Sequence, residues 1–191
     1  GWKDFEDFNS FRGGKTGVML GLSGMYQKYN EGTVYGRANA SLVSGITGDI
    51  TVNFGGASLF AYAVWENGQN ARRTLTNEPL GDSNPWGFLV QGGYFLADDF
   101  EVFGRYEYGV LGTSRPSYPN DELNMLTVGF NWFLKKNDLK FTLDWGINLD
   151  SLGLPEYGVV GYGSNSGAGY RPDLPGQELQ WSLRAQMQLL F

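Results

Sequence analysis

The chain has 191 residues, with 29 glycines, 16% aromatic residues, 18% charged residues and a formal net charge of −6. It contains no cysteine and no histidine, which excludes disulfides and thiolate metal sites and removes the commonest general base and transition-metal ligand. The acidic balance argues against nucleic acid as a partner. Glycine stands at roughly double its usual share of about 7%, which together with the aromatic content favours strands and tight turns over helix or disorder.

The chain contains no run of 18 apolar residues, so we expect no transmembrane helix. Its mean hydropathy of −0.30 leaves a membrane β-barrel open, because lipid-facing and lumen-facing residues alternate along such strands and average out. The sequence starts at Gly1 without a signal peptide. We therefore expect either that a signal has been removed or that the sequence belongs to a longer chain.

Apolar and polar residues alternate with a period of two along most of the chain, which is typical of β-strands. Residues 1–14 lack this alternation, and we interpret them as an ordered connector that leads into a β-segment over 15–191. The alternation predicts about eight strands, at about 16–27, 42–54, 58–66, 86–96, 100–110, 122–134, 139–149 and 178–191. Residues 34–54 fit either one long strand or two shorter ones, and we prefer one strand over 42–54.

The connections between these strands alternate in length. Gly55-Gly56, 97–99 and 135–138 are short, whereas the polar stretches 67–85, 111–121 and 150–177 are long. Outer-membrane barrels of bacteria have short periplasmic turns, long external loops and an even number of strands. The pattern thus predicts an all-β fold, a transmembrane antiparallel β-barrel built as a meander, with the connector on the periplasmic side.

The last strand carries the clearest alternation of the chain. A half-buried strand of a soluble protein usually alternates for about four to eight residues, and the run over 178–191 is about twice as long. It ends on an aromatic residue. We interpret its apolar face as a membrane-insertion signal, made of Trp181, Leu183, Met187, Leu189 and Phe191.

Aromatic residues stand near many of the predicted strand ends: Tyr26, Phe54, Trp65, Trp86, Tyr94, Phe100, Tyr108, Trp132 and Phe191. Membrane barrels place aromatic girdles at both interfaces with water. Aromatic residues are also common in strands of every kind, so this feature supports the membrane interpretation only together with the loop lengths and the last strand.

Four segments resemble the phosphate-selective porin O/P family, whose members are trimeric 16-stranded outer-membrane channels. They are 87–96 (GFLVQGGYFL), 100–107 (FEVFGRYE), 126–134 (LTVGFNWFL) and 184–191 (RAQMQLLF). The resemblance covers the chain from about residue 46 to its end and implies the carboxy-terminal half of a 16-stranded porin. In that family the pore-narrowing loop and most of the cationic ladder lie in the other half, so anion selectivity is not carried over.

The candidate functional residues are the polar residues that alternate with the apolar ones. We expect these pore-lining residues to be Asp49, Thr51, Asn53, Gln91, Glu101, Arg105, Glu107, Asn131, Lys140, Asp144, Arg184, Gln186 and Gln188. In a wide barrel they line water, whereas in a closed eight-stranded barrel they fill the interior. We also expect the charged residues around 101–107 to pair with those around 140–184 in a ladder of mixed sign.

Enzymatic and metal functions find little support. Outer-membrane phospholipases and omptin-type proteases depend on a histidine, which this chain lacks, so we expect no catalytic residue and no cofactor. Asp98-Asp99 and Asp121-Glu122 carry oxygen ligands for calcium, but a hard-cation site needs several converging oxygens. A solvated turn is the better interpretation of both.

The leading hypothesis is a passive outer-membrane porin of a Gram-negative bacterium that conducts small hydrophilic solutes or ions. The implied partners are outer-membrane lipid, two further copies in a homotrimer, and the barrel-insertion machinery. The alternative is a self-contained small eight-stranded barrel with a structural or adhesion role through loops 67–85 and 150–177. A soluble lipid-binding barrel is disfavoured, because Phe141, Leu143 and Trp145 would then need a dry core.

Overall fold

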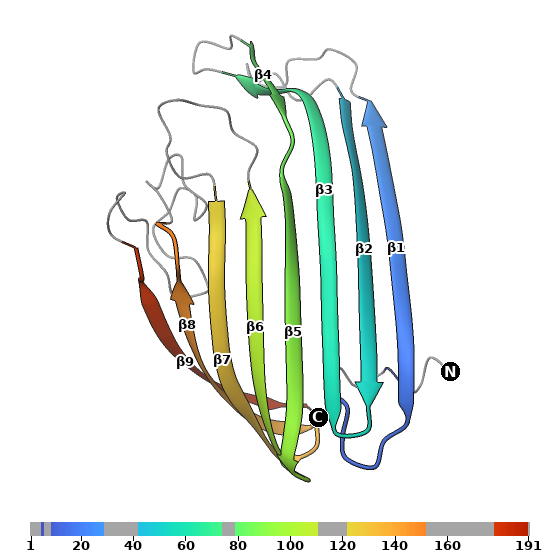
Figure 1. Cartoon of the computed structure of the whole chain (residues 1–191), viewed down its shortest axis with the longest axis vertical. Coiled ribbons are helices and arrows are strands. Elements are labelled where there is room, and N and C mark those ends of the chain that lie inside the picture. The colour runs from blue at the N-terminus through green and yellow to red at the C-terminus, as the bar shows by residue number, and fades with distance from the viewer. Residues whose placement is uncertain are drawn as a thin grey trace.

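The structure, a computed structural model, describes residue 5 and residues 9–28, 42–73, 79–110, 122–151 and 178–190. These residues form one antiparallel sheet and contain no α-helix (Figure 1). The strands are β1 (Thr16–Lys28), β2 (Leu42–Phe54), β3 (Ala57–Arg73), β4 (Pro79–Ser83), β5 (Trp86–Ala97), β6 (Phe100–Val110), β7 (Glu122–Lys135), β8 (Leu139–Asn148) and β9 (Trp181–Leu189).

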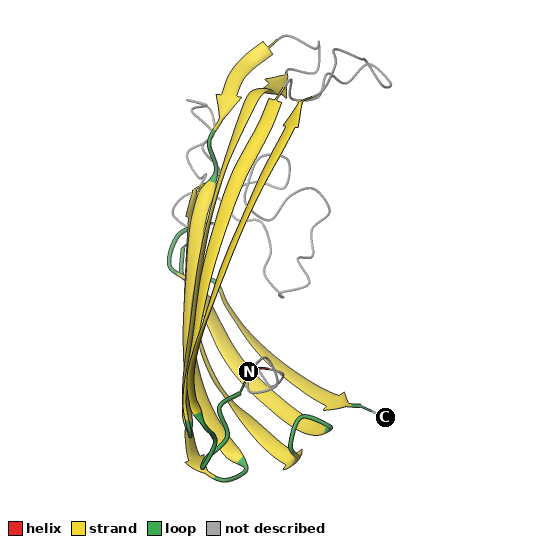
Figure 2. Cartoon of the chain, turned by 90° about the vertical axis from the view of Figure 1, so that its right-hand side faces the viewer, coloured by secondary structure: helices red, strands yellow, loops and turns green. Residues whose placement is uncertain are grey.

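Eight of the strands follow one another as a meander in the order β1-β2-β3-β5-β6-β7-β8-β9, and the short β4 pairs with β3. The predicted all-β antiparallel meander is therefore confirmed. The sheet is strongly curved (Figure 2). Among the described strands β1 pairs only with β2 and β9 only with β8, so the sheet is open and does not close on itself.

The predicted short turns lie together where the strands end on one side, which we call the turn end of the sheet. The opposite ends of the strands form the loop end (Figure 1). Gly55 and Gly56 have φ of 71° and 126° and join β2 to β3, a backbone conformation that favours glycine. The β7–β8 turn contains Lys136 at φ 46° and is closed by an ion pair of 3.4 Å between Lys135 and Asp138.

The prediction of a long polar loop over 67–85 was wrong. Strand β3 continues to Arg73, and β4 lies inside the predicted loop and pairs with β3 through Gly68↔Ser83 and Arg72↔Gly81. Residues 67–73 are polar or small at nearly every position, so their side chains gave no alternation. Backbone hydrogen bonds to the neighbouring strands make this segment a strand even though its sequence does not alternate.

The last strand is also shorter than predicted. Strand β9 covers nine residues, because Leu179 has φ of 69° and breaks the extended backbone before Trp181. Its pairing with β8 is prolonged at both ends, where Asn148 donates to the Gln180 carbonyl and Leu190 to the Asp138 carbonyl, at 2.8 and 2.7 Å. The first part of the ambiguous segment 34–54 lies outside the described residues, and β2 begins at Leu42.

The register divides the side chains into two faces of opposite character. The rows Val52↔Leu59 and Ala61↔Val90 are apolar across neighbouring strands, and Leu20 and Leu22 on the same face are 73% and 81% exposed. The residues in between, such as Thr51 and Asn53, face the other way and are buried. The polar face is the concave one, since residues 9–14 pack against it on the inner side of the curve (Figure 2).

Candidate functional site

All the residues predicted to line a pore lie on the concave face. The rows that show this cross the whole sheet, for example Gln91↔Arg105↔Thr127 and Glu101↔Asn131↔Thr142↔Gln186. The set consists of Asp49, Thr51 and Asn53 on β2, Gln91 on β5, Glu101, Arg105 and Glu107 on β6, Asn131 on β7, Lys140 and Asp144 on β8, and Arg184, Gln186 and Gln188 on β9. The concave face is thus the candidate functional surface.

Near the turn end a chain of hydrogen bonds runs across three strands. The Thr142 hydroxyl donates to Asn131 Oδ1 at 2.6 Å, and Asn131 Nδ2 donates to Glu101 Oε2 at 2.8 Å. Asn9 Nδ2 donates to the same Glu101 oxygen at 2.7 Å. Glu101 is only 2% exposed, and Gly93 makes room for it, because a Cβ at Gly93 would collide with the Glu101 carboxylate.

Two ion pairs occupy the middle of the face. Arg184 donates through Nε to Asp144 Oδ1 at 2.6 Å, and its Nη2 lies 2.5 Å from the same oxygen. This pair joins two residues of the same predicted group, on β8 and β9. The predicted ion pairs between the residues around 101–107 and those around 140–184 do not form among the described residues, because β7 lies between β6 and β8. Arg105 instead lies 3.0 Å from Glu107 on its own strand. Both pairs neutralise charge within the face.

Residues Asn9–Gly14, which we call the anchor segment, contact two of the turns at the turn end, the one at Gly55-Gly56 and the one after β5. The Ser10 hydroxyl accepts from the Gly55 and Gly56 amides at 2.9 and 3.4 Å. The Arg12 guanidinium donates to the Leu96 carbonyl at 3.4 Å and lies 3.7 Å from Asp98.

The ring of the anchor residue Phe11 packs against Phe95 and Phe133, with both pairs of ring centroids 5.1 Å apart. Phe95 and Phe133 are 2% and 3% exposed. Sequence reasoning identified a connector here but missed that it completes the best-buried part of the described structure. The sequence signal for this packing was the presence of aromatic residues in a segment that lacks strand alternation.

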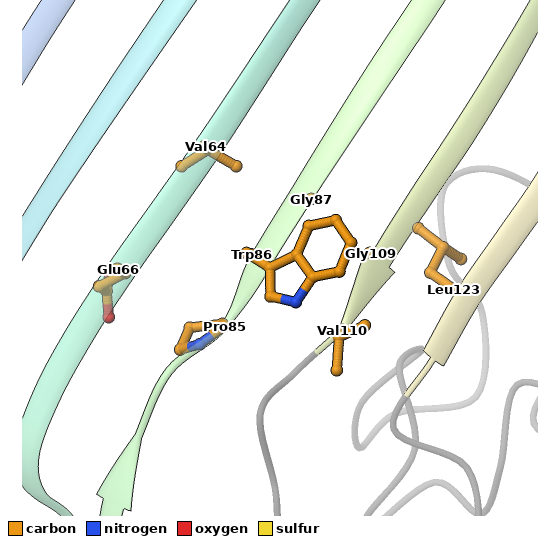
Figure 3. Close-up of a pocket in the computed structure, with 8 residues that line it drawn as sticks. All are labelled: Val64, Glu66, Pro85, Trp86, Gly87, Gly109, Val110 and Leu123. Atoms are coloured by element: carbon orange, nitrogen blue, oxygen red, sulfur yellow. The ribbon is translucent and has the colours of Figure 1, made fainter.

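The loop end of the concave face contains a hollow of about 280 Å³ (Figure 3). Val64, Gly87, Gly109 and Leu123 form a row across four strands, and all four line the hollow. The two glycines in the middle leave bare backbone as its floor. Glu66, Pro85, Trp86 and Val110 also line it. Periodicity did not predict the hollow, because it arises from two glycines that meet only in the folded register.

The convex face carries the predicted aromatic residues in two groups. Phe54, Tyr94, Phe100 and Trp132 lie toward the turn end, and Tyr26, Trp65, Trp86 and Tyr108 toward the loop end. Of the predicted insertion signal, Trp181, Leu183, Met187 and Leu189 lie on the same face and are exposed; Phe191 lies outside the described residues.

The acidic pairs weighed as calcium sites have other roles where they are described. Asp99 accepts a hydrogen bond of 3.2 Å from the Trp132 indole, and Asp98 faces Arg12. Within the described ranges no group of three or more acidic side chains is placed to hold a metal ion; Asp121 lies outside them.

In the described part of the chain, no helix is long and apolar enough to cross a membrane. Comparison with known proteins gave no match to a protein-family model, to a curated protein or to a solved structure.

Proposed function

We propose that this chain forms part of the wall of a passive diffusion channel in a bacterial outer membrane. The observation that carries the proposal is the apolar convex face, which is continuous across all eight strands of the meander while the concave face is polar. A soluble protein rarely exposes an apolar patch larger than a few hundred Å². A membrane barrel requires an apolar outer face toward lipid and tolerates apolar residues among the polar ones on its inner face.

The dimensions of the convex face agree with a bilayer. Trp86 and Tyr94 lie eight residues apart on β5, as do Phe100 and Tyr108 on β6. At a rise of about 3.3 Å per residue, each pair spans about 26 Å along its strand, which is about 20 Å of membrane height at a strand tilt of about 40°. The apolar band of outer-membrane barrels is about 25 Å tall and is flanked by aromatic girdles. The two groups of aromatic residues fit those girdles.

The concave face suits small hydrophilic solutes and ions rather than one selected ion. Its charges are of both signs, and Asp144–Arg184 and Arg105–Glu107 form internal pairs. Polar side chains along a pore wall set the local field that a solute meets, and pairs of opposite sign weaken that field. We therefore propose weak ion selectivity.

The open edges of β1 and β9 require further strands, because unpaired backbone groups are not viable in lipid. The resemblance to the phosphate-selective porin O/P family supports a 16-stranded barrel, of which this chain supplies about half, and a homotrimer. The alternative, a self-contained eight-stranded barrel with an adhesion role, needs pairing between β1 and β9. The described strands do not make that pairing, so we do not favour it.

Planar-bilayer recording of this chain, purified together with the strands that complete its barrel, tests this proposal. We expect stable, ohmic conductance steps in both directions of voltage, with little preference between potassium and chloride. A matched sample of the Gly93→Val variant, whose new side chain collides with Glu101, controls for contaminating porins, since it should insert poorly. Folded wild-type protein that inserts and leaves the bilayer silent would contradict the proposal.

A further inference from the structure

The carboxylates on the concave face differ in their partners. Glu107 and Asp144 pair with arginines, and Glu101 accepts hydrogen bonds from two amides. The Asp49 carboxylate lies directly over Gly21 of β1. Glu66 lines the hollow at the loop end, and its side chain, like that of Asp49, forms no ion pair within the part of the chain that the structure describes.

The hollow suits a flat apolar group. Its floor is the backbone of Gly87 and Gly109, which face each other on β5 and β6, and its sides are Val64 and Leu123 (Figure 3). Its volume is about 280 Å³. An apolar cavity of about 150 Å³ suffices for benzene, so a six-membered ring with a short chain fits here.

An apolar strip continues from the hollow along β3. Val64 and Tyr62 both lie on the concave face, at 39% and 40% exposure. Most of the other exposed large apolar side chains of the described strands point to the convex face. The exposed ring of Tyr62 also offers a face that attracts cations.

We propose that this hollow binds small organic cations that carry a flat apolar ring, such as arylalkyl ammonium ions. The ring lies on the backbone of Gly87 and Gly109, and the ammonium group lies at Glu66. Charge complementarity selects this occupant: the carboxylate at the hollow has no cation of its own among the described residues, and an anionic ring would meet it unfavourably. The site requires only that the concave face is accessible, and so it goes beyond the proposed channel function.

An equilibrium binding experiment tests the site without reference to conductance. The probe is 4-fluorophenethylammonium, followed by ¹⁹F NMR with the full chain folded in phosphatidylcholine nanodiscs, and empty nanodiscs give the partition into lipid. We expect a dissociation constant on the order of 1 mM, as for a ligand of about ten non-hydrogen atoms. 4-Fluorophenylacetate, which has the same ring and the opposite charge, should bind at least about fivefold more weakly.

Two variants separate the contributions of charge and ring. Glu66→Gln keeps the shape and should weaken binding of the ammonium probe about fivefold. Gly109→Val should abolish binding, because its side chain fills the hollow; a Cβ at Gly109 meets its neighbours at 3.5 Å or more, so the backbone there has room for a Cβ. The matched controls are Glu122→Gln, at the same end of the sheet but on the convex face, and Gly104→Val, where a Cβ meets nothing within 4 Å. Both should bind like the wild type.

The outcomes are decisive in either direction. Weakened binding by Glu66→Gln with unchanged controls supports the site, and circular dichroism of each variant verifies that its sheet is intact. Equal binding of the acetate and ammonium probes overturns the site, as does binding no stronger than to empty nanodiscs. A chain that conducts ions and does not bind the probe overturns the site and leaves the channel proposal standing.

Discussion

The two ends of the concave face are built in opposite ways. At the turn end, the anchor segment, the rings of Phe95 and Phe133 and the Glu101 network fill the space, and Phe95, Phe133 and Glu101 are almost fully buried. At the loop end, Gly87 and Gly109 leave a hollow bordered by Glu66, which has no ion-pair partner among the described residues. Each end uses a glycine on the concave face, but Gly93 makes room for a neighbouring side chain, whereas Gly109 leaves its space empty.

From this difference we infer that the turn end contributes most to stability and the loop end to binding. A curved sheet whose convex face is apolar has no conventional core on that side, so its packing must come from the concave face. The turn end supplies such packing through Phe11 and Ser10 of the anchor segment. At the loop end, Gly87 and Gly109 leave a hollow in the concave face instead. Substitutions at the turn end should therefore change stability, and substitutions at the loop end should change binding.

The largest effect is expected for Phe95→Ala. Phe95 is 2% exposed and packs against Phe11 and Phe133, so its removal should lower the free energy of unfolding by about 3–5 kcal/mol. Urea titration of the protein folded in micelles measures this. Phe54→Ala on the convex face, where the ring is 56% exposed, should cost much less. Equal losses in the two variants would contradict a packed turn end.

The next largest effect on stability is expected for Gly93, whereas Gly109 should tolerate the same substitution. Gly93→Ala should destabilise the fold by about 1–3 kcal/mol, because the new methyl group displaces the Glu101 carboxylate from its amide partners. Gly109→Ala should be close to neutral, since its Cβ meets only ordinary contacts.

A double-mutant cycle measures whether Gly93 and Glu101 are energetically coupled. In Gly93→Ala/Glu101→Ala the clash is absent, so the combined loss should be smaller than the sum of the single losses. Additive losses in the urea titration would show that Glu101 is not what fills the space over Gly93.

A smaller effect is expected for Ser10→Ala. The hydroxyl accepts from the amides of Gly55 and Gly56, and its loss should cost about 1 kcal/mol in the same titration. Ser23→Ala on β1, where the side chain is exposed, is the matched control and should change stability by less than about 0.5 kcal/mol. A larger loss of stability in Ser23→Ala than in Ser10→Ala would mean that contacts of β1, and not those of the anchor segment, stabilise this part of the fold.

The smallest effect is expected for Arg12→Ala. Its ion pair with Asp98 is 3.7 Å long and lies at the surface, and such pairs contribute about 0–1 kcal/mol. Raising the salt concentration should weaken even this contribution. A loss above about 2 kcal/mol would mean that Arg12 anchors the segment through more than charge.

The sequence predicted the meander, its short turns and both faces, because alternation with a period of two is a local signal that side chains such as Val128 and Thr127 carry directly. It did not predict β4 or the end of β3, where most residues are polar or small and the sequence therefore shows no alternation. The ion pairs of the concave face were not predicted, because their partners depend on strand order: Arg105 has Glu107 beside it, and β7 separates it from β8. The anchor segment and the hollow depend on contacts between distant residues, which a single sequence does not display.

We propose that the convex face contacts lipid and the concave face contacts water. The chain contains no cysteine, so single cysteines provide clean probes. Neighbouring residues on an edge strand give the most direct test: Leu22→Cys and Ser23→Cys on β1, and Met187→Cys and Gln186→Cys on β9, are all exposed positions. In lipid vesicles, spin labels at residues 22 and 187 should collide with oxygen and be shielded from a water-soluble nickel complex, and labels at residues 23 and 186 should show the reverse. Equal access of the nickel complex to all four positions would contradict the account.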